Sequence, residues 1–420
     1  SVKNSASSLK KYSKINFNKD KDISILNSCG EWSYLQSNDL NIKIKNLLPF
    51  NFYKYLPKTG LIQSRLSFIM IFVLNFFPLL FHIKKNKPDF LIIHLLTLLP
   101  IILSPLISKD TKIILRISGL PKMNFFRKFI WRKFSKYLFL ITTPTQLTAE
   151  NLIDLKIFNR KKIHLLRDPV INCNEITIKK RIELDENYLN KDYYLSIGRL
   201  TNQKNLSFLI KVFSENYQKF KNKKLVIVGD GENQTRLQEM IINYKMENNI
   251  FLVGFKKNAY RYIENCLALI SVADYEDPGF TLIEAAYLKK KIITSLVKNG
   301  PIEMKKNGDM CYFFEPKNEV DFVNKILASE KDINCGLKII KAQKFSKEFT
   351  TFSHYKCLEK LLNYEHERHF QILLSYNPKE KVTIICHNEG HGGQQCLQNI
   401  IQDLTNHGFS SEVLSKPNNV

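Results

Sequence analysis

The sequence predicts an α/β protein with two doubly wound, Rossmann-like lobes built on parallel sheets. Two observations support this prediction. Short apolar runs alternate with helical patterns, and they form one series before residue 175 and another after residue 190. Continuous apolar runs of this kind are typical of strands buried on both faces of a sheet. A length of 420 residues with 44% hydrophobic content is enough for two or three domains with large cores.

The first lobe is expected over residues 1–175. Its predicted strands are short, rich in Ile, Leu and Phe, and separated by helical patterns; they are ISIL (23–26), FLIIHLL (90–96), KIILRIS (112–118), KYLFLITT (136–143) and KIHLLRD (162–168). Because such runs recur with helices between them, we expect the strands to lie parallel in one sheet.

The second lobe is expected over residues 176–370, including a closing helical stretch that begins near residue 342. Its predicted strands are YYLSIG (193–198), KLVIVGDG (224–231), IFLVGF (250–255), LALISVA (267–273) and KIITS (291–295). Residues 371–380 form a polar linker with a proline. Ligands of doubly wound sheets bind beyond the carboxyl ends of the strands, so a site is expected there, in the cleft between the lobes.

Two longer apolar runs raise the question of a membrane. Residues 65–85 contain about 18 residues between charges, near the lower limit for a spanning helix, but the run includes Asn75 and Pro78. We interpret it as a buried helix or one that lies at an interface. Residues 90–109 are interpreted as a buried strand that leads into a helix near Pro100. Neither run is predicted to span a membrane.

The positive charge of the chain is concentrated in the first lobe. The net charge is +24, and residues 1–170 hold 28 Lys or Arg against 9 Asp or Glu. Such a field attracts polyanions. The chain has no zinc-finger or aromatic RNA-binding signature, so nucleic acid is not the expected partner. The basic residues lie among apolar segments, which favours an anionic membrane surface; solvated lysines on an ordinary enzyme remain the alternative. Eight scattered cysteines without a CxxC pair indicate reduced, cytosolic thiols.

A polar loop follows the predicted strand that ends at Gly198. It holds Arg199 and Lys204, and a helix starts near Asn205 or Leu206. Two cations and free backbone amides at the carboxyl edge of a sheet favour a pyrophosphate site. A basic loop that only caps a helix is the alternative, and the stretch alone does not exclude it.

The segment YEDPGFTLIEAAYLKKK (275–291) places Glu276 and Glu284 eight positions apart across a Pro-Gly turn. Thr281 and Glu284 fit a capping box, so Glu284 could satisfy the first amides of a helix. That explanation leaves Glu276 without a structural role. Gly279 would let the backbone approach a ligand closely, and the helix amino terminus favours phosphates.

Taken together, these segments resemble a known family. GRLTNQKNLSFLI, VIVGDGE, FLVGF, EDPGFTLIEAA and NGPIEMKKNGDMCYFFEPKN, in this order, are similar to the donor-binding lobe of family-4 retaining glycosyltransferases. The resemblance is strong over residues 190–345 and weak over residues 1–175. It implies the two-lobed GT-B architecture, and the R-x4-K and E-x7-E spacings are its specific signals.

The resemblance also implies roles for individual residues. Arg199 and Lys204 would bind the donor diphosphate in place of a metal ion, with Gly198 beside them, so no metal and no cofactor are expected. Glu276 would face hydroxyls of the donor sugar, and Glu284 would accept hydrogen bonds from the ribose. The backbone of Gly279, Phe280 and Thr281 would contact the sugar and phosphates, whereas Phe255 and Lys256 are candidates for contacts with the base.

The acceptor side of the predicted site is less well defined. Some relatives carry a histidine after the strand that corresponds to KIILRIS, but this chain has Ser118 and Gly119 there. His94, at the end of an earlier strand, is the nearest imidazole candidate; a hydrogen-bonded core histidine is the alternative. Residues 124–139 interleave Arg and Lys with aromatic residues, which suits a helix on anionic lipid or an amphipathic helix packed on the lobe.

Residues 381–420 read as strand, glycine loop, helix and strand. The segment CHNEGHGGQQ departs from the zinc motif H-E-x-x-H, so a metal site is not expected there. The pattern is similar to the start of another family-4 lobe, while the front of the chain looks like such a lobe without its first strand. We therefore expect a fragment of a tandem polypeptide with a truncated third α/β unit at residues 381–420. A circular permutation, in which these residues supply the missing strand, is the less favoured alternative.

The sequence thus predicts sugar transfer with retention from a nucleotide-sugar to a glycan or lipid-linked saccharide, in cell-surface polysaccharide or lipopolysaccharide biosynthesis. The expected location is the cytoplasm, peripheral on the inner face of the cytoplasmic membrane. A nucleotide-sugar epimerase or sugar phosphorylase on the same lobes is one alternative. A non-catalytic protein that binds membranes or polyanions is another.

Overall fold

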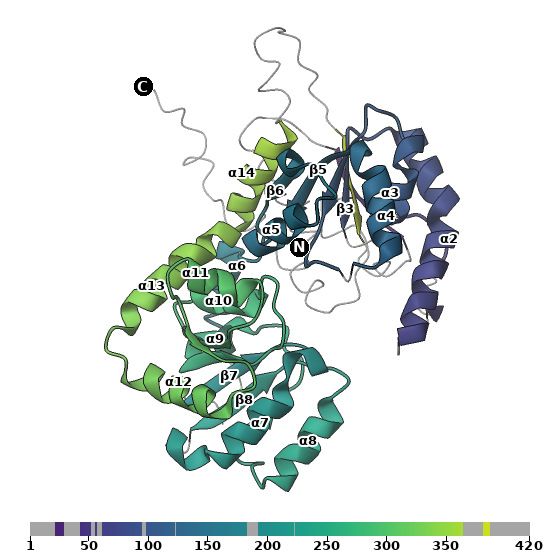
Figure 1. Ribbon diagram of the computed structural model, residues 1–420. Coiled ribbons are helices and arrows are strands. Elements are labelled where there is room, and N and C mark those ends of the chain that lie inside the picture. Colours follow the sequence, from purple (N-terminus) through teal and green to yellow (C-terminus); the bar gives the residue numbers. More distant parts are fainter. Residues whose placement is uncertain are drawn as a thin grey trace, which may run out of the picture. The chain divides into compact units, whose positions relative to one another are not determined.

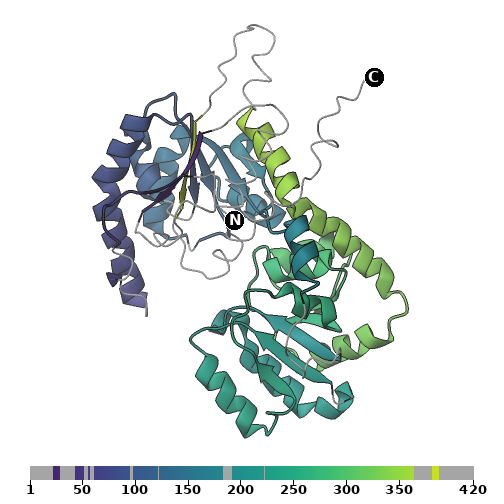
Figure 2. The same cartoon turned by 180° about the vertical axis from the view of Figure 1, so that it is seen from behind.

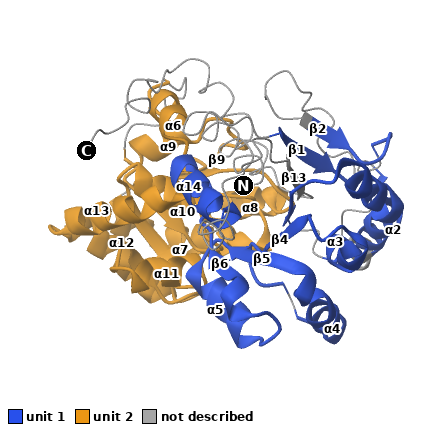
Figure 3. Ribbon diagram, turned by 90° about the horizontal axis from the view of Figure 1, so that it is seen from above, with its two compact units in different colours: residues 1–169, 351–420 blue, residues 170–350 orange. Residues whose placement is uncertain are grey.

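The computed structural model contains two compact units, residues 1–169 with 351–420, and residues 170–350. Figure 3 colours them separately. The structure describes residues 22–28, 43–51, 55–56, 61–94, 98–121, 123–182, 192–221, 223–363 and 381–386. Both units contain a parallel sheet with helices packed against it. The predicted α/β class with two Rossmann-like lobes is therefore confirmed.

Unit 1 is built on a seven-stranded parallel sheet in the order β2-β1-β13-β3-β4-β5-β6. Every strand is short, and most positions in β1, β3, β4 and β5 are buried. The strands are β1 (Asp22–Asn27), β2 (Lys43–Asn46), β3 (Phe90–His94), β4 (Lys112–Arg116), β5 (Leu138–Thr143), β6 (Ile163–Leu165) and β13 (Lys381–Cys386).

Strand β13 lies inside this sheet, between β1 and β3, although it comes from the end of the chain. It pairs with β1 from Asp22↔Lys381 to Asn27↔Cys386, and with β3 on its other side. The strand is drawn in yellow beside the purple β1 in Figure 2. Residues 381–386 thus occupy the position that the permuted arrangement assigned to them, rather than starting a sheet of their own. The glycine loop, helix and strand predicted after residue 386 lie outside the described residues.

Helices cover both faces of the unit 1 sheet. One face carries α2 (Leu61–Asn86), α3 (Leu99–Leu103), α4 (Phe125–Phe134) and α5 (Gln146–Asp154), and α2, α3 and α4 follow one another in Figure 1. Alternate strand residues such as Leu91 and Ile93 pack against this layer, whereas Phe90 and Ile92 face the other side. There α14 (Thr351–Leu362) covers the sheet with Tyr355 and Leu358.

Unit 2 has a six-stranded parallel sheet in the order β12-β11-β10-β7-β8-β9. Its strands are β7 (Tyr193–Ile197), β8 (Lys224–Val228), β9 (Ile250–Leu252), β10 (Ala268–Ser271), β11 (Lys291–Ser295) and β12 (Tyr312–Phe314). One face packs on α6 (Cys173–Lys179), α9 (Tyr260–Asn265), α10 (Phe280–Tyr287) and α13 (Cys335–Ser346). The other packs on α7 (Leu206–Glu215), α8 (Gln234–Asn243) and α12 (Glu319–Lys331); α11 (Gly300–Lys306) follows β11.

The units divide the chain at other positions than the limits of 175 and 370 expected from the sequence. Helix α14, which the pattern assigned to the second lobe, packs through Tyr355, Leu358 and Leu362 against Ile23 and Ile25 of unit 1. The helical pattern after residue 342 takes in the end of α13 and all of α14, and these two helices belong to different units. A periodic apolar stripe shows that a helix has a buried face, but it does not show which sheet the face covers.

Candidate functional site

Most of the predicted site residues lie in unit 2, beyond the carboxyl ends of its strands. Gly198 and Arg199 directly follow β7, and Lys204 ends a short 3-10 turn (Asn202–Lys204) that precedes α7. Glu276 follows the neighbouring strand β10, and Gly279 and Phe280 begin α10. Because β7 and β10 are hydrogen-bonded neighbours in a parallel sheet, the two loops meet at one edge.

Lys204 and Glu276 form an ion pair at this edge. The Lys204 Nζ atom lies 2.5 Å from Glu276 Oε1, and the two side chains are 21% and 8% exposed. The stem of Lys204 lies against Gly198, where an added Cβ would be 3.2 Å from Lys204 Cε. The structure thus brings three of the residues singled out from the sequence into contact.

Gln203 joins the two loops beside this ion pair. Its side-chain amide donates to the Tyr275 carbonyl oxygen at 2.9 Å, and its own carbonyl accepts from the Asp274 amide at 2.9 Å. These bonds flank the Lys204–Glu276 contact, so the spacing of the cation and the carboxylate is fixed by the backbone as well as by their charges. Sequence reasoning did not identify Gln203.

The loop that carries Glu276 is also held by residues at the start of α11. Asn299 Nδ2 donates to Tyr275 Oη at 2.8 Å and to Asp277 Oδ2 at 2.7 Å. The Gly300 amide donates to the Glu276 carbonyl at 3.0 Å, and an added Cβ on Gly300 would lie 1.8 Å from the Pro278 carbonyl oxygen. Only glycine fits at such a close approach of two backbones. Both residues head the segment NGPIEMKKNGDMCYFFEPKN, but sequence reasoning gave neither of them a role, although an Asn-Gly pair before a helix is a usable signal.

A glycine loop after β8 supports the loop of Gly198 and Arg199. The Gly198 amide donates to the Val228 carbonyl at 3.0 Å, and an added Cβ on Gly229 would lie 1.9 Å from the Gly198 carbonyl oxygen. With a φ of +144°, Gly229 is in a region that other residues rarely adopt. The glycines of VIVGDGE therefore pack the two loops together.

The capping box expected between Thr281 and Glu284 is wrong. Helix α10 begins at Phe280 after Gly279, which has a φ of +88° and supplies no side-chain cap. Thr281 therefore lies within the first turn and not at the cap position. The physical reason is that the tight turn at Pro278 and Gly279 starts the helix two residues earlier than the capping pattern requires.

Glu284 instead faces α6 and α9 of the same unit. Tyr260 Oη donates to Glu284 Oε1 at 3.4 Å. Burial and the nearby negative charge of Glu175 raise the pKa of Glu284 to about 8, and the Tyr260 bond and Lys179 oppose this only in part. Glu175 is 6% exposed and pairs with Lys179 at 2.8 Å. Glu284 is thus mostly protonated at neutral pH. Glu175, Lys179 and Tyr260 were not identified from the sequence.

The remaining donor-side candidates are less closely joined. Arg199 is exposed, two residues beyond the end of β7. Phe255 and Lys256 follow β9 at the same edge of the sheet, and Phe255 is exposed. Gly279 is buried, while Phe280 and Thr281 are partly buried in the first turn of α10. These residues share an edge of the sheet with the Lys204–Glu276 pair.

The acceptor-side candidates lie in unit 1. His94 ends β3, is 3% exposed, and its Nε2 has no hydrogen-bond partner within the part of the chain that the structure describes. Burial, and next the positive charge of Arg116, hold the pKa of His94 well below its usual value, so the ring is neutral. Ser118 is exposed and Gly119 has a φ of +82°, just beyond β4.

Arg116 is the neighbour of His94 in the sheet and was not singled out from the sequence. Its Nη2 lies 2.7 Å from Asp168 Oδ1, and both side chains are 2% exposed. Burial opposes ionisation of Asp168, but the charge and hydrogen bond of Arg116 hold the pKa of this carboxyl below its usual value. Arg116 Nη1 also donates to Thr142 Oγ1 at 3.4 Å. Charged and polar side chains therefore collect at the carboxyl ends of β3, β4 and β5.

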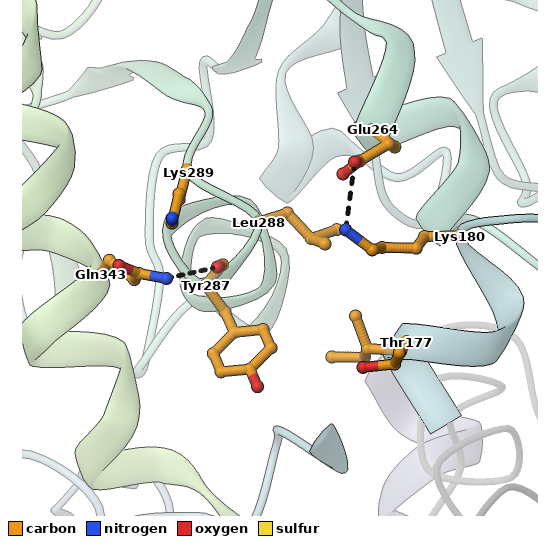
Figure 4. A pocket seen from close by; sticks show the side chains of 8 residues that line it. Thr177, Lys180, Glu264, Tyr287, Leu288, Lys289 and Gln343 are labelled. Carbon is orange, nitrogen blue, oxygen red and sulfur yellow. Dashed lines mark hydrogen bonds and ion pairs between the residues drawn. The ribbon is translucent and has the colours of Figure 1, made fainter. Parts of the chain in front are cut away.

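Unit 2 also contains a cavity of about 280 Å³ away from the Lys204–Glu276 pair. Figure 4 shows Tyr287 and Thr177 facing it, with the Lys180–Glu264 ion pair at one side. None of the residues predicted from the sequence lines it. Across the described residues, no group of three or more His, Cys, Asp or Glu side chains is arranged to hold a metal ion.

The fold and site describe a two-lobed α/β protein with cations and carboxylates at the edge of a parallel sheet. Comparison with known proteins adds a specific class. Residues 178–347 match the family model described as glycosyl transferases group 1. The segment coincides closely with unit 2.

The chain is also similar to individual glycosyltransferases. It is 32% identical over 263 residues to an uncharacterized glycosyltransferase of Methanocaldococcus jannaschii, and the match covers 57% of this chain and 62% of that protein. It is 27% identical over 181 residues to the N-acetylgalactosamine-N,N'-diacetylbacillosaminyl-diphospho-undecaprenol 4-alpha-N-acetylgalactosaminyltransferase of Campylobacter jejuni, covering 43% of this chain and 47% of that protein. The chain therefore spans less than two thirds of either relative.

Among solved structures, that of Anabaena HepE in complex with UDP and glucose superposes with a TM-score of 0.59 at 13% identity. The match covers 82% of this chain and 99% of HepE. At that identity the likeness shows the fold alone, and it supports the GT-B class for the two Rossmann-like lobes.

Proposed function

We propose that the protein transfers a sugar from a nucleotide-sugar donor, with retention, to a glycan or a lipid-linked saccharide. The observation that carries the proposal is the Lys204–Glu276 ion pair beside Gly198, inside a group 1 glycosyltransferase domain. The family resemblance gives these two residues adjacent parts of the donor to bind. A diphosphate would lie at the cation, and the hydroxyls of the sugar at the carboxylate.

The proposed chemistry uses the charges at this edge of the sheet. When the bond between the anomeric carbon and the phosphate oxygen breaks, its electron pair stays on the diphosphate, and positive charge develops on the sugar ring. Arg199, Lys204 and the first amides of α10 would stabilise the leaving group, because fixed charges and dipoles need no reorganisation. The acceptor oxygen bonds to the anomeric carbon on the same face, and its proton passes to a phosphate oxygen. This proposal requires no metal ion and no cofactor.

The other residues have proposed roles around this centre. Glu284 would accept hydrogen bonds from the ribose, and the backbone of Gly279, Phe280 and Thr281 would contact the sugar and phosphates. Phe255 and Lys256 would contact the base. On the acceptor side, His94 together with Ser118 and Gly119 would lie near the saccharide; Arg116 and Asp168 would fix that edge of the sheet.

We further propose a role in cell-surface polysaccharide or lipopolysaccharide biosynthesis, at the cytoplasmic face of the membrane. Two observations support this: the Campylobacter relative is named for an acceptor on diphospho-undecaprenol, and the net charge of this chain is +24. A lipid-linked acceptor is presented at a membrane surface, and anionic lipids attract a basic protein.

The test uses the Lys204→Ala and Glu276→Ala variants. We expect both to lose sugar transfer while unfolding close to wild type, because each residue is in a loop and neither belongs to an apolar core cluster. UDP should still raise the melting temperature of Glu276→Ala and should do so much less for Lys204→Ala, since only the lysine is assigned to the diphosphate. The control removes Lys211 and Glu319, an ion pair of similar length, 2.6 Å, on exposed helices.

Other outcomes would contradict parts of the proposal. Full transfer by both variants would overturn the assignment of the ion pair. Product formed without an acceptor saccharide would indicate an epimerase or a phosphorylase. A wild-type chain that no nucleoside diphosphate stabilises, but that binds polyanions in a strongly salt-dependent way, would be a binding protein instead.

A further inference from the structure

Helix α2 carries a continuous row of exposed apolar side chains. The row recurs at helical spacing along one side and consists of Leu66, Ile69, Met70, Val73, Leu74, Phe77 and Phe81, which are 37–75% exposed. At 1.5 Å per residue, the span from residue 66 to 81 is about 22 Å. Figure 1 shows α2 as the outermost helix of its layer in unit 1. An apolar surface of this size on a soluble protein marks an interaction site.

The opposite side of α2 belongs to the core of unit 1. Ile71, Leu79 and Ile83 are each no more than 2% exposed and pack with strand residues such as Leu91 and Ile93. Among the described residues, α2 is the one helix long and apolar enough to cross a membrane, with 28% of its most apolar window buried. A transmembrane position would remove these three residues from the core. The helix is therefore fixed along the side of the lobe.

The charges beside the row favour an anionic partner. Lys84, Lys85 and Lys87 are exposed at the carboxyl end of α2. Helix α4, separated from α2 by α3, exposes Phe125 and Phe129 next to basic residues. If a second copy of the chain covered this surface, its lysines would lie close to the lysines of the first copy and repel them. An anionic lipid surface satisfies both the apolar row and the lysines.

We propose that unit 1 docks on an anionic bilayer with α2 parallel to the membrane plane and the row from Leu66 to Phe81 inserted between the headgroups. The flat orientation follows from the buried side of the helix, and the charge sign of the lipid follows from the terminal lysines. This inference rests on the membrane location proposed above and names the surface responsible for it; because it concerns lipid binding only, it holds or fails independently of sugar transfer.

The test measures flotation of the full chain with vesicles of phosphatidylcholine containing phosphatidylglycerol. We expect the double variant Phe77→Ser, Phe81→Ser to bind about tenfold more weakly or worse, because two exposed phenylalanines no longer enter the bilayer. The control is Leu337→Ser, Ile340→Ser on α13, where both residues are 64% exposed. It should bind like wild type. Equal binding by the two double variants would overturn the proposal.

Orientation is tested separately with tryptophans introduced as Ile69→Trp and Phe81→Trp and with brominated lipids. A flat helix predicts that both tryptophans are quenched most strongly by bromines near the headgroups. Quenching of one by deep bromines and of the other by shallow ones would show a spanning or steeply tilted helix and would refute the flat orientation. Binding to neutral vesicles as tight as to anionic ones would refute the assigned lipid charge.

A second inference comes from Asn299, which has a strained backbone. Its φ of +73° and ψ of −108° lie in a region that side-chain-bearing residues rarely adopt, and the residue is 3% exposed. Its amide donates to both Tyr275 and Asp277, the residues on either side of Glu276, and its backbone forms a bridge with Glu276 itself. A glycine would relieve the strain. The hydrogen bonds of the Asn299 side chain must therefore offset the free energy of the strained backbone.

We infer that Asn299 is a positioning residue that holds the Glu276 carboxylate at the donor sugar; this inference rests on the proposed function. The two amide hydrogens of Asn299 fix the side chains of Tyr275 and Asp277. The backbone of Glu276, which lies between these residues, is then held in one conformation. Because Glu276 is assigned to the sugar and Lys204 to the diphosphate, loss of the Asn299 amide should affect sugar transfer without affecting binding of the free nucleotide.

The test compares Asn299→Gly with Asn307→Gly, which alters the other end of the same helix, α11. We expect Asn299→Gly to keep the wild-type affinity for UDP and to lose about ten- to a hundredfold in kcat for transfer, as one or two hydrogen bonds to a positioned loop are removed. Asn307→Gly should match wild type in both measurements.

The outcomes separate this inference from the proposed function. Failure of UDP to bind the wild-type chain would count against the proposed function. Normal UDP binding and normal transfer by Asn299→Gly would refute only the positioning role. Equal loss of UDP binding and transfer would show a general structural role, which also contradicts the inference.

Discussion

Replacement of Glu284 by Gln tests how its environment sets its charge. The wild-type carboxyl has a pKa of about 8 in the folded protein against a reference of 4.5. The folded state therefore holds a proton between these values that the unfolded state has released. By linkage, the wild-type free energy of unfolding falls as the pH rises through this window, and the cost is complete above pH 8. Gln cannot ionise, so the variant lacks this dependence.

The magnitude follows from the slope of about 1.4 kcal/mol per pH unit for one group. From pH 5.5 to 7.5 the limit is about 2.7 kcal/mol, and solvent access to the partly buried side chain reduces this to about 1–2 kcal/mol. We thus expect the stability advantage of Glu284→Gln over wild type to grow by about 1–2 kcal/mol between pH 5.5 and pH 7.5. Gln keeps a side-chain oxygen that accepts hydrogen bonds, so the ribose contact proposed above should survive the substitution.

Urea unfolding of both chains at intervals from pH 5.5 to 7.5 measures this difference. Glu319→Gln, at the exposed pair with Lys211, controls for the removal of one carboxyl group. A difference between wild type and Glu284→Gln that stays constant across this range would refute the reasoning. It would mean that Glu175 and burial do not keep the proton on Glu284.

Three further predictions concern the scaffold. Gly229→Ala should abolish the packing of the two glycine loops and cost at least about 3 kcal/mol of stability in unit 2, measured by urea unfolding, because the new Cβ would lie 1.9 Å from the Gly198 carbonyl. Asp168→Asn should cost about 3–5 kcal/mol in unit 1, since it leaves the buried Arg116 charge unpaired; Asp168→Asn combined with Arg116→Met should recover much of the loss. Deletion of residues 371–420 should remove amide protection from β1 and β3 in hydrogen exchange, because β13 pairs with these two strands of unit 1. Strands β7 and β8 of unit 2 should stay protected. Unchanged protection of β1 and β3 would show that the central strand is dispensable.

The fold class could be predicted because its signals are local. Each buried strand is a short apolar run, and such runs as ISIL, FLIIHLL and KLVIVGDG fall in β1, β3 and β8 or at their ends. The run at residues 65–85 also became a helix with one buried face, despite Pro78 within it. Periodicity identifies elements of this kind from a single sequence.

The partner of an element is a different matter, as β13 and α14 show. Both have clear local patterns, yet their neighbours are β1, β3 and the Ile23 face of unit 1, which lie hundreds of positions away in the sequence. A strand buried between two others has the same composition in either arrangement of the tail. The pattern therefore left the tandem module and the permuted strand as alternatives, and the pairing in the structure is what favours the second arrangement for residues 381–386.

The same distinction applies to the site. Lys204 and Glu276 could be named from motif spacing, whereas Asn299, Glu175 and Tyr260 act through contacts that no spacing encodes. The capping box at Thr281 shows the opposite case, in which a local pattern is present but the turn at Gly279 overrides it. Glu284 then has no amide to cap, and its charge is set by burial and, next, by Glu175 from another helix. Its ionisation is therefore a property of the folded unit, which is why a pH titration of stability reports on the site more directly than the motif does.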